Sequence, residues 1–464
     1  MRSLADRRAL PPPGAAVETG SLTAAPEVVT EPPRTERQRM SGIVARLTVG
    51  GVLGAATGFV TGPLLARALG ATGRGDLAAV VVPLGLVPPV LALGIPAFAY
   101  RELPRGRAIE ELVGSLGLPL VVIGLAAAAA AVPLADALAG GREVVRTLLI
   151  VVFISMPLLL VGGLLQMSLA ALERWRAVFA TRLIPFVVPF FVIVALYLLG
   201  DLTVASAAIA TIAGSLLAVV PGVCLLAKAR RPVFRSALAR EGVVFGVKSW
   251  IGGLAMIANL RLDQFLMITV VAPRVLGLYA VATTIAGASG LATGALTPPL
   301  MSRVGAGEMS LLPQAVRITV SATLLLNVVL ALATPTLLSV LFGPEFRGAI
   351  PMTLILLGAS VSYGGASVLS SGLQAAGAPL IPSAAEGIAL VITVVGLLTL
   401  LRPFGGVGAA IVSLVAYSTS FLVQLVMARQ RTGLPLREFL VPTRADGLWA
   451  RALLSGMILR LRPA

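Results

Sequence analysis

Residues 178–199 read VFATRLIPFVVPFFVIVALYLL, an apolar run in which Arg182 is the single charged residue. A helix of about 20 residues crosses the hydrocarbon core of a bilayer, so this run predicts a membrane span. The whole chain shares its composition: 57% of the 464 residues are hydrophobic, 12% are charged, and the mean hydropathy is +0.98. A water-soluble domain does not carry so apolar a surface, so the sequence predicts an all-α integral membrane protein.

Runs of similar length recur on both sides of this one, and about twelve in all are expected to span the membrane. Prolines inside the runs are expected to kink the helices rather than end them, because neighbouring helices can satisfy the freed backbone groups. The expected spans are residues 42–66, 77–100, 112–135, 146–171, 178–199, 203–227, 246–271, 276–302, 315–342, 350–375, 380–401 and 405–428.

Polar segments flank and divide these spans. Residues 1–40 are rich in Pro, Arg, Glu and Thr and predict a disordered cytoplasmic tail without a cleaved signal peptide, since the first apolar run begins near Gly42. Residues 229–245 are expected to form a cytoplasmic linker, and residues 429–464 a basic cytoplasmic tail. With this placement most of the 36 Lys and Arg residues lie inside, which predicts a multi-pass protein of the cell membrane with both termini cytoplasmic.

The two halves of the chain resemble each other at a nearly constant offset. Gly75 and the apolar residues after it align with Gly277 and the residues after it, 202 positions later. This offset predicts a duplicated unit of six helices, with an N-lobe over residues 41–228 and a C-lobe over residues 246–428. Parallel repeats of this kind are expected to enclose a substrate cavity between them, as in transporters.

Residue types that carry common catalytic chemistry are scarce. The chain has no histidine and one cysteine, Cys224, which excludes Ser-His-Asp, Cys-His and HExxH chemistry, disulfides within the chain and thiolate metal clusters. The acidic residues expected outside the membrane lie on short connections. The sequence therefore predicts a protein that is not an enzyme and has no catalytic residues, no cofactor and no metal site.

Several motifs resemble one family of membrane transporters. They are GVKSW at 246–250 with NLRLDQ at 259–264 and LGLYAVA at 276–282, LARALG at 65–70 with GRGD at 73–76, LFGPEF at 341–346, and LQAAGAP at 373–379. Together they are similar to Wzx-type polysaccharide transporters of the multidrug/oligosaccharidyl-lipid/polysaccharide (MOP) exporter superfamily. The resemblance implies a MATE-like fold with two six-helix lobes, alternating access, and export of an undecaprenyl-pyrophosphate-linked oligosaccharide for cell-surface polysaccharide.

Ionisable residues inside spans are costly, so each is a candidate for function. Asn259 and Asp263 are four residues apart and share one helical face, whereas Arg261 lies on another face. Two interpretations stay open for Asp263 and its neighbours, including Gln264. They form either a polar site beside the cavity that binds a cation or a sugar, or a structural pair between helices. Coupling to H⁺ or Na⁺ fits the first.

Arg182 and Glu386 occupy corresponding positions in the two halves, 204 residues apart, and can pair across a closed cavity. For a pyrophosphate cargo, Arg182, Arg261 and Lys248 are the expected partners, because guanidinium and ammonium groups bind phosphate oxygens. The alternative for Lys248 is that its side chain only extends to the inner interface.

Four functions compete on these residues. The first is the flippase, whose expected partners are lipid-linked oligosaccharide, membrane lipid, a glycan polymerase and glycosyltransferases, with no nucleic acid. The second is a cation-coupled multidrug antiporter of the MATE type with Asp263 as its coupling carboxylate, and a lipid II flippase is a further variant. A membrane glycosyltransferase or polymerase and a purely structural scaffold come last.

Overall fold

In the computed structural model of the chain, the described residues are 34–226, 232–290, 311–443 and 446, and side chains are described from residue 56 onward except 251 and 252. The chain divides into two units, Met1–Ser41 and Gly42–Ala464. The second unit holds the features that follow.

Every described element is helical. We divide the elements into two groups by their order along the chain. The first group contains α1 (Arg34–Leu91), α2 (Ile95–Glu102), η1 (Leu103–Arg105), α3 (Ile109–Ala129), α4 (Ala131–Ala139), α5 (Glu143–Ile154), α6 (Met156–Ala171), α7 (Trp175–Leu199), α8 (Val204–Leu217) and α9 (Val220–Leu226). The second group contains α10 (Ser236–Val270), α11 (Pro273–Gly287), α13 (Leu311–Leu337), η2 (Leu338–Phe342), η3 (Pro344–Ala349), α14 (Ile350–Ala375), α15 (Leu380–Thr432) and α16 (Arg437–Leu440).

Among the described residues, eight single helices are long and apolar enough to cross a membrane, and the bent pair α5 and α6 makes a ninth span. The all-helical membrane architecture is thus confirmed, and the count is lower than twelve because two of the elements each contain two expected spans. α1 and α15 each change direction at a glycine with a non-helical, positive φ, Gly70 (φ 67°) and Gly405 (φ 53°), so each of these elements contains two of the expected spans. The expected span 276–302 is described only as far as residue 290.

Prolines bend the helices without ending them where neighbours support the backbone. α7 continues through Pro185 and Pro189 to Leu199, as the sequence predicts. Pro157 lies at the start of α6, where α5 and α6 meet at an angle of 49°. The expected span 146–171 is therefore a broken helix.

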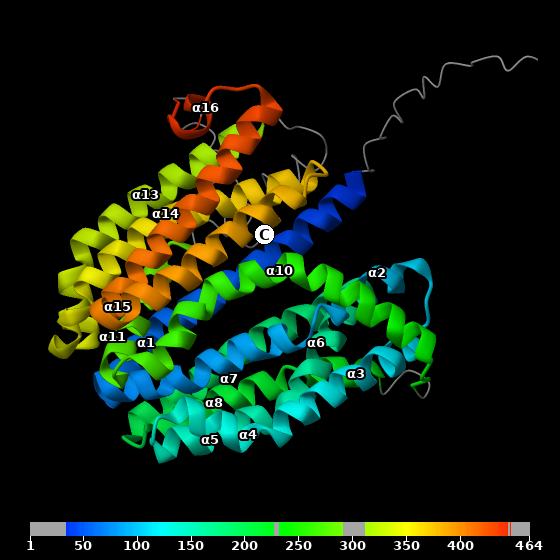
Figure 1. Ribbon diagram of the computed structural model, residues 1–464, viewed down its shortest axis with the longest axis horizontal. Helices are drawn as coiled ribbons and strands as arrows, with labels where there is room; N and C mark the ends of the chain where they lie inside the picture. Colours follow the sequence, from blue (N-terminus) through cyan, green and yellow to red (C-terminus); the bar gives the residue numbers. More distant parts are fainter. Residues whose placement is uncertain (1–33, 227–231, 291–310, 444–445, 447–464) are drawn as a thin grey trace, which may run out of the picture. The chain divides into compact units, whose positions relative to one another are not determined.

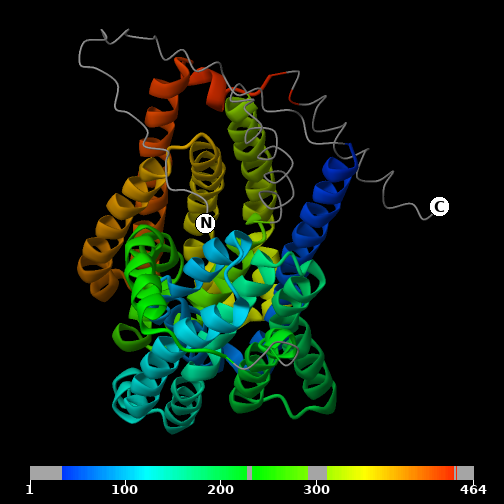
Figure 2. The same cartoon turned by 90° about the vertical axis from the view of Figure 1, so that its right-hand side faces the viewer.

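α10 joins the two groups of helices. It begins at Ser236, inside the segment expected to be a linker, and packs against α2 and α3 along its first half and against α15 along its second half. Figures 1 and 2 both show α13, α14 and α15 on one side of α10 and the cyan and green helices of the first group on the other. A single long helix therefore contacts both candidate lobes.

The two groups meet closely at a seam between α1 and α11. A Cβ on Gly75 would lie 1.8 Å from the carbonyl oxygen of Pro273, and one on Gly277 would lie 1.9 Å from that of Ala71. Arg67 adds hydrogen bonds to two carbonyl groups at the end of η2, one of them to Leu341 at 2.9 Å. The backbones of α1 and α11 are thus in direct contact at this seam.

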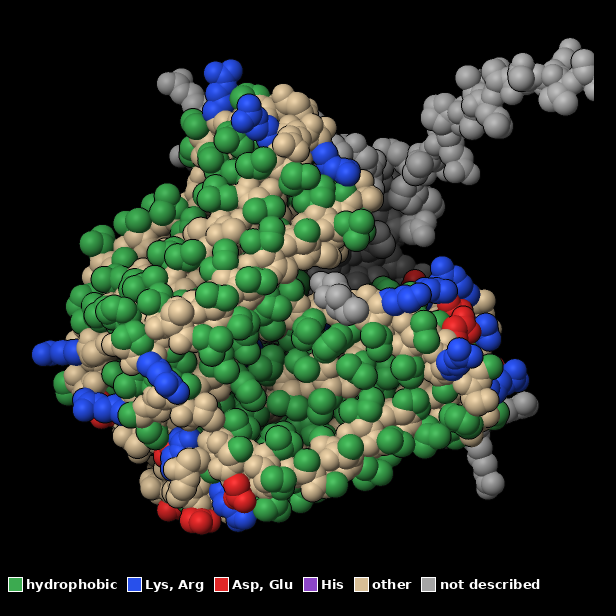
Figure 3. All heavy atoms as spheres, in the orientation of Figure 1, with side chains coloured by type: hydrophobic (Ala, Val, Ile, Leu, Met, Phe, Trp, Pro, Cys, Tyr) green, Lys and Arg blue, Asp and Glu red, His purple; other side chains and the backbone are tan. Residues whose placement is uncertain are grey.

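Large apolar side chains cover much of the outer surface. Leu198, Leu332 and Phe191 are 78%, 80% and 65% exposed. Figure 3 shows hydrophobic side chains over the middle of the visible face and charged ones gathered toward the ends of helices. Such a surface is stable in lipid, where helices satisfy all of their own backbone groups.

Candidate substrate cavity and buried polar cluster

A cavity of about 730 Å³ lies among α1, α2, α6, α7, α8 and the first half of α10. Most of its wall is apolar, from residues such as Pro88, Leu160, Phe186 and Val219, and α10 adds Ser249 and Trp250. Because the wall comes from the first group together with α10, the cavity lies at the junction of the two groups. A cavity of this size and lining suits an amphiphilic ligand.

A tight turn positions the α2 side of this cavity. Leu93 and Gly94 both have positive φ, at 47° and 67°, which turns the chain from α1 into α2. A Cβ on Gly94 would lie 2.4 Å from the carbonyl oxygen of Gly246, so glycine is required for the close approach of this turn to α10.

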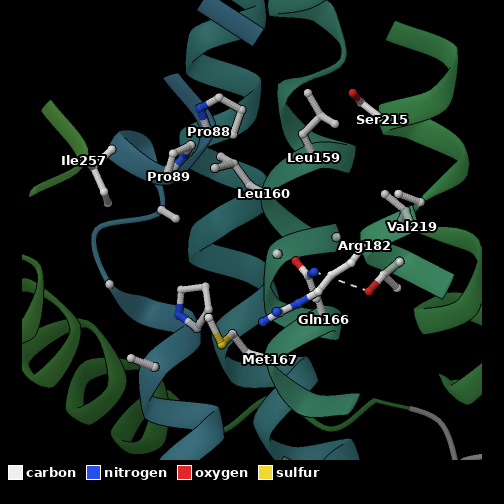
Figure 4. A pocket seen from close by; sticks show the side chains of 18 of the residues that line it. Pro88, Pro89, Leu159, Leu160, Gln166, Met167, Arg182, Ser215, Val219 and Ile257 are labelled. Carbon is white, nitrogen blue, oxygen red and sulfur yellow. Dashed lines mark hydrogen bonds between the residues drawn. The ribbon is translucent and has the colours of Figure 1, made fainter. Parts of the chain in front are cut away.

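Arg182 is the charged residue of the cavity wall. Its side chain is exposed and extends from α7 into the cavity, beside Gln166 and Met167 (Figure 4). Gln166 donates to the Thr181 hydroxyl at 3.3 Å, whereas the Arg182 guanidinium has no hydrogen bond or ion pair with any described residue. A guanidinium left uncommitted among apolar groups is suited to an anionic group of a ligand.

A second polar site lies in the other group of helices, around Asp263 of α10. The carboxylate accepts hydrogen bonds from the hydroxyl of Tyr279 in α11 and, at 3.4 Å, from that of Ser413 in α15. It also accepts the backbone N–H of Gln264 at 2.7 Å. Asp263 is 5% exposed, and no cationic group among the described residues pairs with it. Its direct contacts are thus three hydrogen bonds, from two hydroxyl groups and one backbone N–H.

Asn259, which shares a face of α10 with Asp263, bonds to Glu386 of α15. Its side-chain N–H₂ donates to the Glu386 carboxylate at 2.9 Å, and its amide oxygen accepts from Thr393 at 3.2 Å. Glu386 also accepts from Ser420 at 2.7 Å, while Tyr417 donates to the Asn259 carbonyl at 3.0 Å. Each carboxylate therefore has its own set of hydrogen-bonded side chains, and the two sets lie together between α10, α11 and α15. We call them the polar cluster.

The residues selected from the sequence separate into these two places. Asn259, Asp263 and Glu386 come together in the polar cluster, and Gln264 is buried beside it. Arg182 lies in the cavity. Arg261, which was expected to bind the cargo with Arg182, is exposed and is absent from the wall of that cavity, and Lys248 is exposed beside a smaller hollow. Arg182 and Glu386 form no ion pair with each other in this structure.

Sequence reasoning missed the hydroxyl groups of the polar cluster. Ser413, Tyr417 and Ser420 are spaced by four and three residues, so they share one face of α15. Polar residues at helical spacing within an apolar run could have indicated that this face of the helix contacts other polar groups. Tyr279 was part of a family motif, yet only the folded chain places its hydroxyl on Asp263.

Comparison with solved structures identifies the fold. The chain is similar to the lipid II flippase MurJ in an inward closed conformation, with a TM-score of 0.71 and 14% identity over 90% of this chain and 93% of that one. A multidrug resistance MATE family transporter of the MOP superfamily, in an inward-facing conformation, matches with a TM-score of 0.62 and 14% identity over 84% and 98%. The MATE multidrug transporter DinF-BH gives a TM-score of 0.59 and 14% identity over 88% and 97%.

The fold and the apolar surface define a multi-pass membrane protein with the fold of MOP-superfamily transporters. No curated protein matches the sequence. The model of the family described as polysaccharide biosynthesis protein matches residues 44–304, more than half of the chain, and the chain belongs to that family. The predicted family and fold class are thereby confirmed, and the relatives in fold are transporters and a flippase rather than enzymes.

Proposed function

We propose that this protein moves an undecaprenyl-pyrophosphate-linked oligosaccharide from the inner to the outer leaflet of the cell membrane. The observation that carries the proposal is the uncommitted guanidinium of Arg182 in a mostly apolar cavity. A lipid-linked pyrophosphate combines an apolar tail with a doubly charged group, and this wall offers a surface for each. The glycosyltransferases and the polymerase that act on such a glycan are the partners that this function requires.

Arg182 would bind the pyrophosphate through parallel hydrogen bonds, since a guanidinium can engage two phosphate oxygens at once. Gln166 and Ser249, which also line the cavity, can add hydrogen bonds to oxygens of the first sugar. Neither Arg261 nor Glu386 is needed for this step, because the one is outside the cavity wall and the other is bound within the polar cluster.

We infer that movement proceeds by alternating access, with residues 41–228 and 246–428 as the two lobes. The seam between α1 and α11 is closed in this structure. In this proposal the seam lies on the outer side, and the cavity is reached from the cytoplasm. The cationic ends of α2 and α10 would then face the cytoplasm, together with both termini, in accordance with the excess of positive charge on that side.

The polar cluster favours coupling of this movement to H⁺ or Na⁺. Asp263 and Glu386 lack a cationic partner among the described residues, and hydroxyl and amide groups surround both carboxylates. Protonation or a bound Na⁺ would lower the cost of burying them. The same observation favours the second candidate function, a MATE-type antiporter that exports cationic amphiphiles.

Transport in liposomes tests the proposal. We expect purified protein to move a defined undecaprenyl-pyrophosphate-linked sugar between leaflets, and Arg182→Gln to lower the rate about tenfold or more, because a charge-assisted hydrogen bond contributes roughly 1.5–3 kcal/mol. Arg176→Gln is the matched control, since Arg176 is exposed on the same helix and absent from the cavity wall. Export of a cationic dye without movement of the lipid-linked sugar would instead establish the antiporter.

A further inference from the structure

A second hollow, of about 500 Å³, lies between α2 and the first half of α10, next to the cavity along both helices. Three cationic side chains line it, those of Arg101, Arg240 and Lys248, against one carboxylate, that of Glu241. Figure 3 shows Lys and Arg side chains gathered over this end of the two helices. The hollow therefore carries a net positive charge.

The α10 side of the hollow is a stripe along one helical face. Arg240, Val244 and Lys248 follow each other at intervals of four residues, and all three are exposed. Arg240 and Lys248 have no hydrogen bond or ion pair within the described part of the chain. An apolar side chain thus separates two uncommitted cations on this wall.

Arg101 on the α2 side is held in place by aromatic rings and a buried carboxylate. Its guanidinium carbon lies 4.6 Å from the ring centre of Phe245 and 5.8 Å from that of Phe98. Its Nε donates to Glu102 at 2.9 Å, and Glu102 is only 6% exposed. The two Nη groups make no hydrogen bond with a described residue, so they remain for a ligand.

We propose that this hollow binds a phosphate group carried by a lipid. Oriented Arg101 Nη groups and the charges of Arg240 and Lys248 suit phosphate oxygens, while Phe245 and Val244 offer apolar contact to the adjoining glycerol or acyl chain. The phosphate can come from an anionic phospholipid such as phosphatidylglycerol or from the pyrophosphate of the carrier lipid. The second source rests on the proposed function, and the first does not.

Lipid retention measured by native mass spectrometry tests the site. The full chain is titrated in one arm with phosphatidylglycerol against phosphatidylcholine, and in the other with undecaprenyl pyrophosphate. The double variant Arg240→Gln/Lys248→Gln is expected to weaken binding about tenfold, since each substitution removes one positive charge that would attract the phosphate. Arg429→Gln/Arg431→Gln is the matched control, because these two arginines are exposed at the end of α15, away from the hollow.

A variant that gains affinity for phosphate distinguishes loss of the binding site from a general loss of structure. Glu241→Gln removes the one carboxylate of the wall and is expected to tighten phosphate binding about threefold, which a destabilised protein would not show. A loss in the first arm assigns the site to phospholipid, and a loss in the second arm alone assigns it to the carrier. Equal retention by all variants in both arms overturns the proposal, whether or not the liposome assay finds transport.

Discussion

Two arginines show how the partners of a charge separate structural roles from binding roles. Arg317 in α13 is 7% exposed, and its Nε and Nη groups bond both oxygens of Asp446, at 2.5 and 2.8 Å, and the carbonyl of Glu438 at 2.5 Å. Arg182 is exposed to a cavity and bonds to no described residue. The first charge is satisfied by the protein itself, so we assign it to stability, and the second remains for a ligand.

The Arg317–Asp446 pair predicts a pH-dependent attachment of the segment after α15. Burial disfavours the charged carboxylate, but hydrogen bonds from Arg317 and Thr443 outweigh it, and the pKa of Asp446 lies below its ordinary value of 3.8. A lowered pKa stabilises the folded segment at neutral pH, and this contribution is lost as the pH falls through the folded value. Phe439, which is fully buried, lies in this segment, so its burial depends on the same attachment.

Asp446→Asn is therefore expected to destabilise the attachment of α16 by about 3 kcal/mol at pH 7, because it removes the carboxylate that accepts two hydrogen bonds from the buried guanidinium. Hydrogen exchange at the Phe439 and Val441 amides measures this opening. Glu438→Gln is the control, since the Glu438 carboxylate lies 3.8 Å from Arg317 and is 46% exposed. Equal exchange in the two variants at pH 7 would contradict the assigned role of the pair.

At the scale of elements, the seam between α1 and α11 depends on two glycines that the sequence offset of 202 relates to each other. The Cβ position of Gly75 lies 3.1 Å from the Gly277 nitrogen, and the Cβ position of Gly277 lies 2.9 Å from the Gly75 nitrogen. Equivalent positions of the two halves thus touch each other, which is the contact that a twofold relation between repeats predicts. Any larger residue at either position separates the two helices.

We expect Gly277→Ala to open this seam and shift the protein toward an outward-facing state. Spin labels at Thr72→Cys and Arg274→Cys, in a Cys224→Ala background, should report a longer distance by double electron–electron resonance. Gly85→Ala is the control, because Gly85 also lies in α1 and its Cβ position has no atom within 4 Å. A distance distribution unchanged by Gly277→Ala would show that the seam does not set the closed state.

The sequence predicted the class of element well and the junctions between elements less well. The composition of long apolar runs such as 178–199 predicts both a helix and its place in the membrane, because a chain in lipid must satisfy its own backbone hydrogen bonds. The kinks at Gly70 and Gly405 depend on local φ values that composition does not report. The buried face of Asn259 and Asp263 followed from spacing, but their bonding partners come from α11 and α15, and single-sequence patterns do not say which helices pack together.

At the scale of the whole molecule, α10 connects the cavity to the polar cluster. Its middle contributes Trp250 and Ile257 to the cavity wall, and its second half carries Asn259 and Asp263. One continuous helix thus contributes both to the cavity wall and to the polar cluster, at positions only a few residues apart. A change in the charge of Asp263 can act on the cavity through movement of α10, without a separate relay of side chains.

This arrangement predicts that binding and driving force can be lost separately. Arg182→Gln should weaken binding of the lipid-linked pyrophosphate in liposomes about tenfold or more at any ion gradient, because it removes a charge that holds the cargo. Asp263→Asn/Glu386→Gln should keep that binding within about threefold, yet remove the acceleration of transport by an imposed H⁺ or Na⁺ gradient, because an amide neither titrates nor supplies a negative charge. Gradient-driven transport that persists in the double variant would place the coupling site elsewhere. If that variant instead weakens cargo binding as much as Arg182→Gln, the polar cluster shapes the cavity itself, and α10 transmits structure rather than charge.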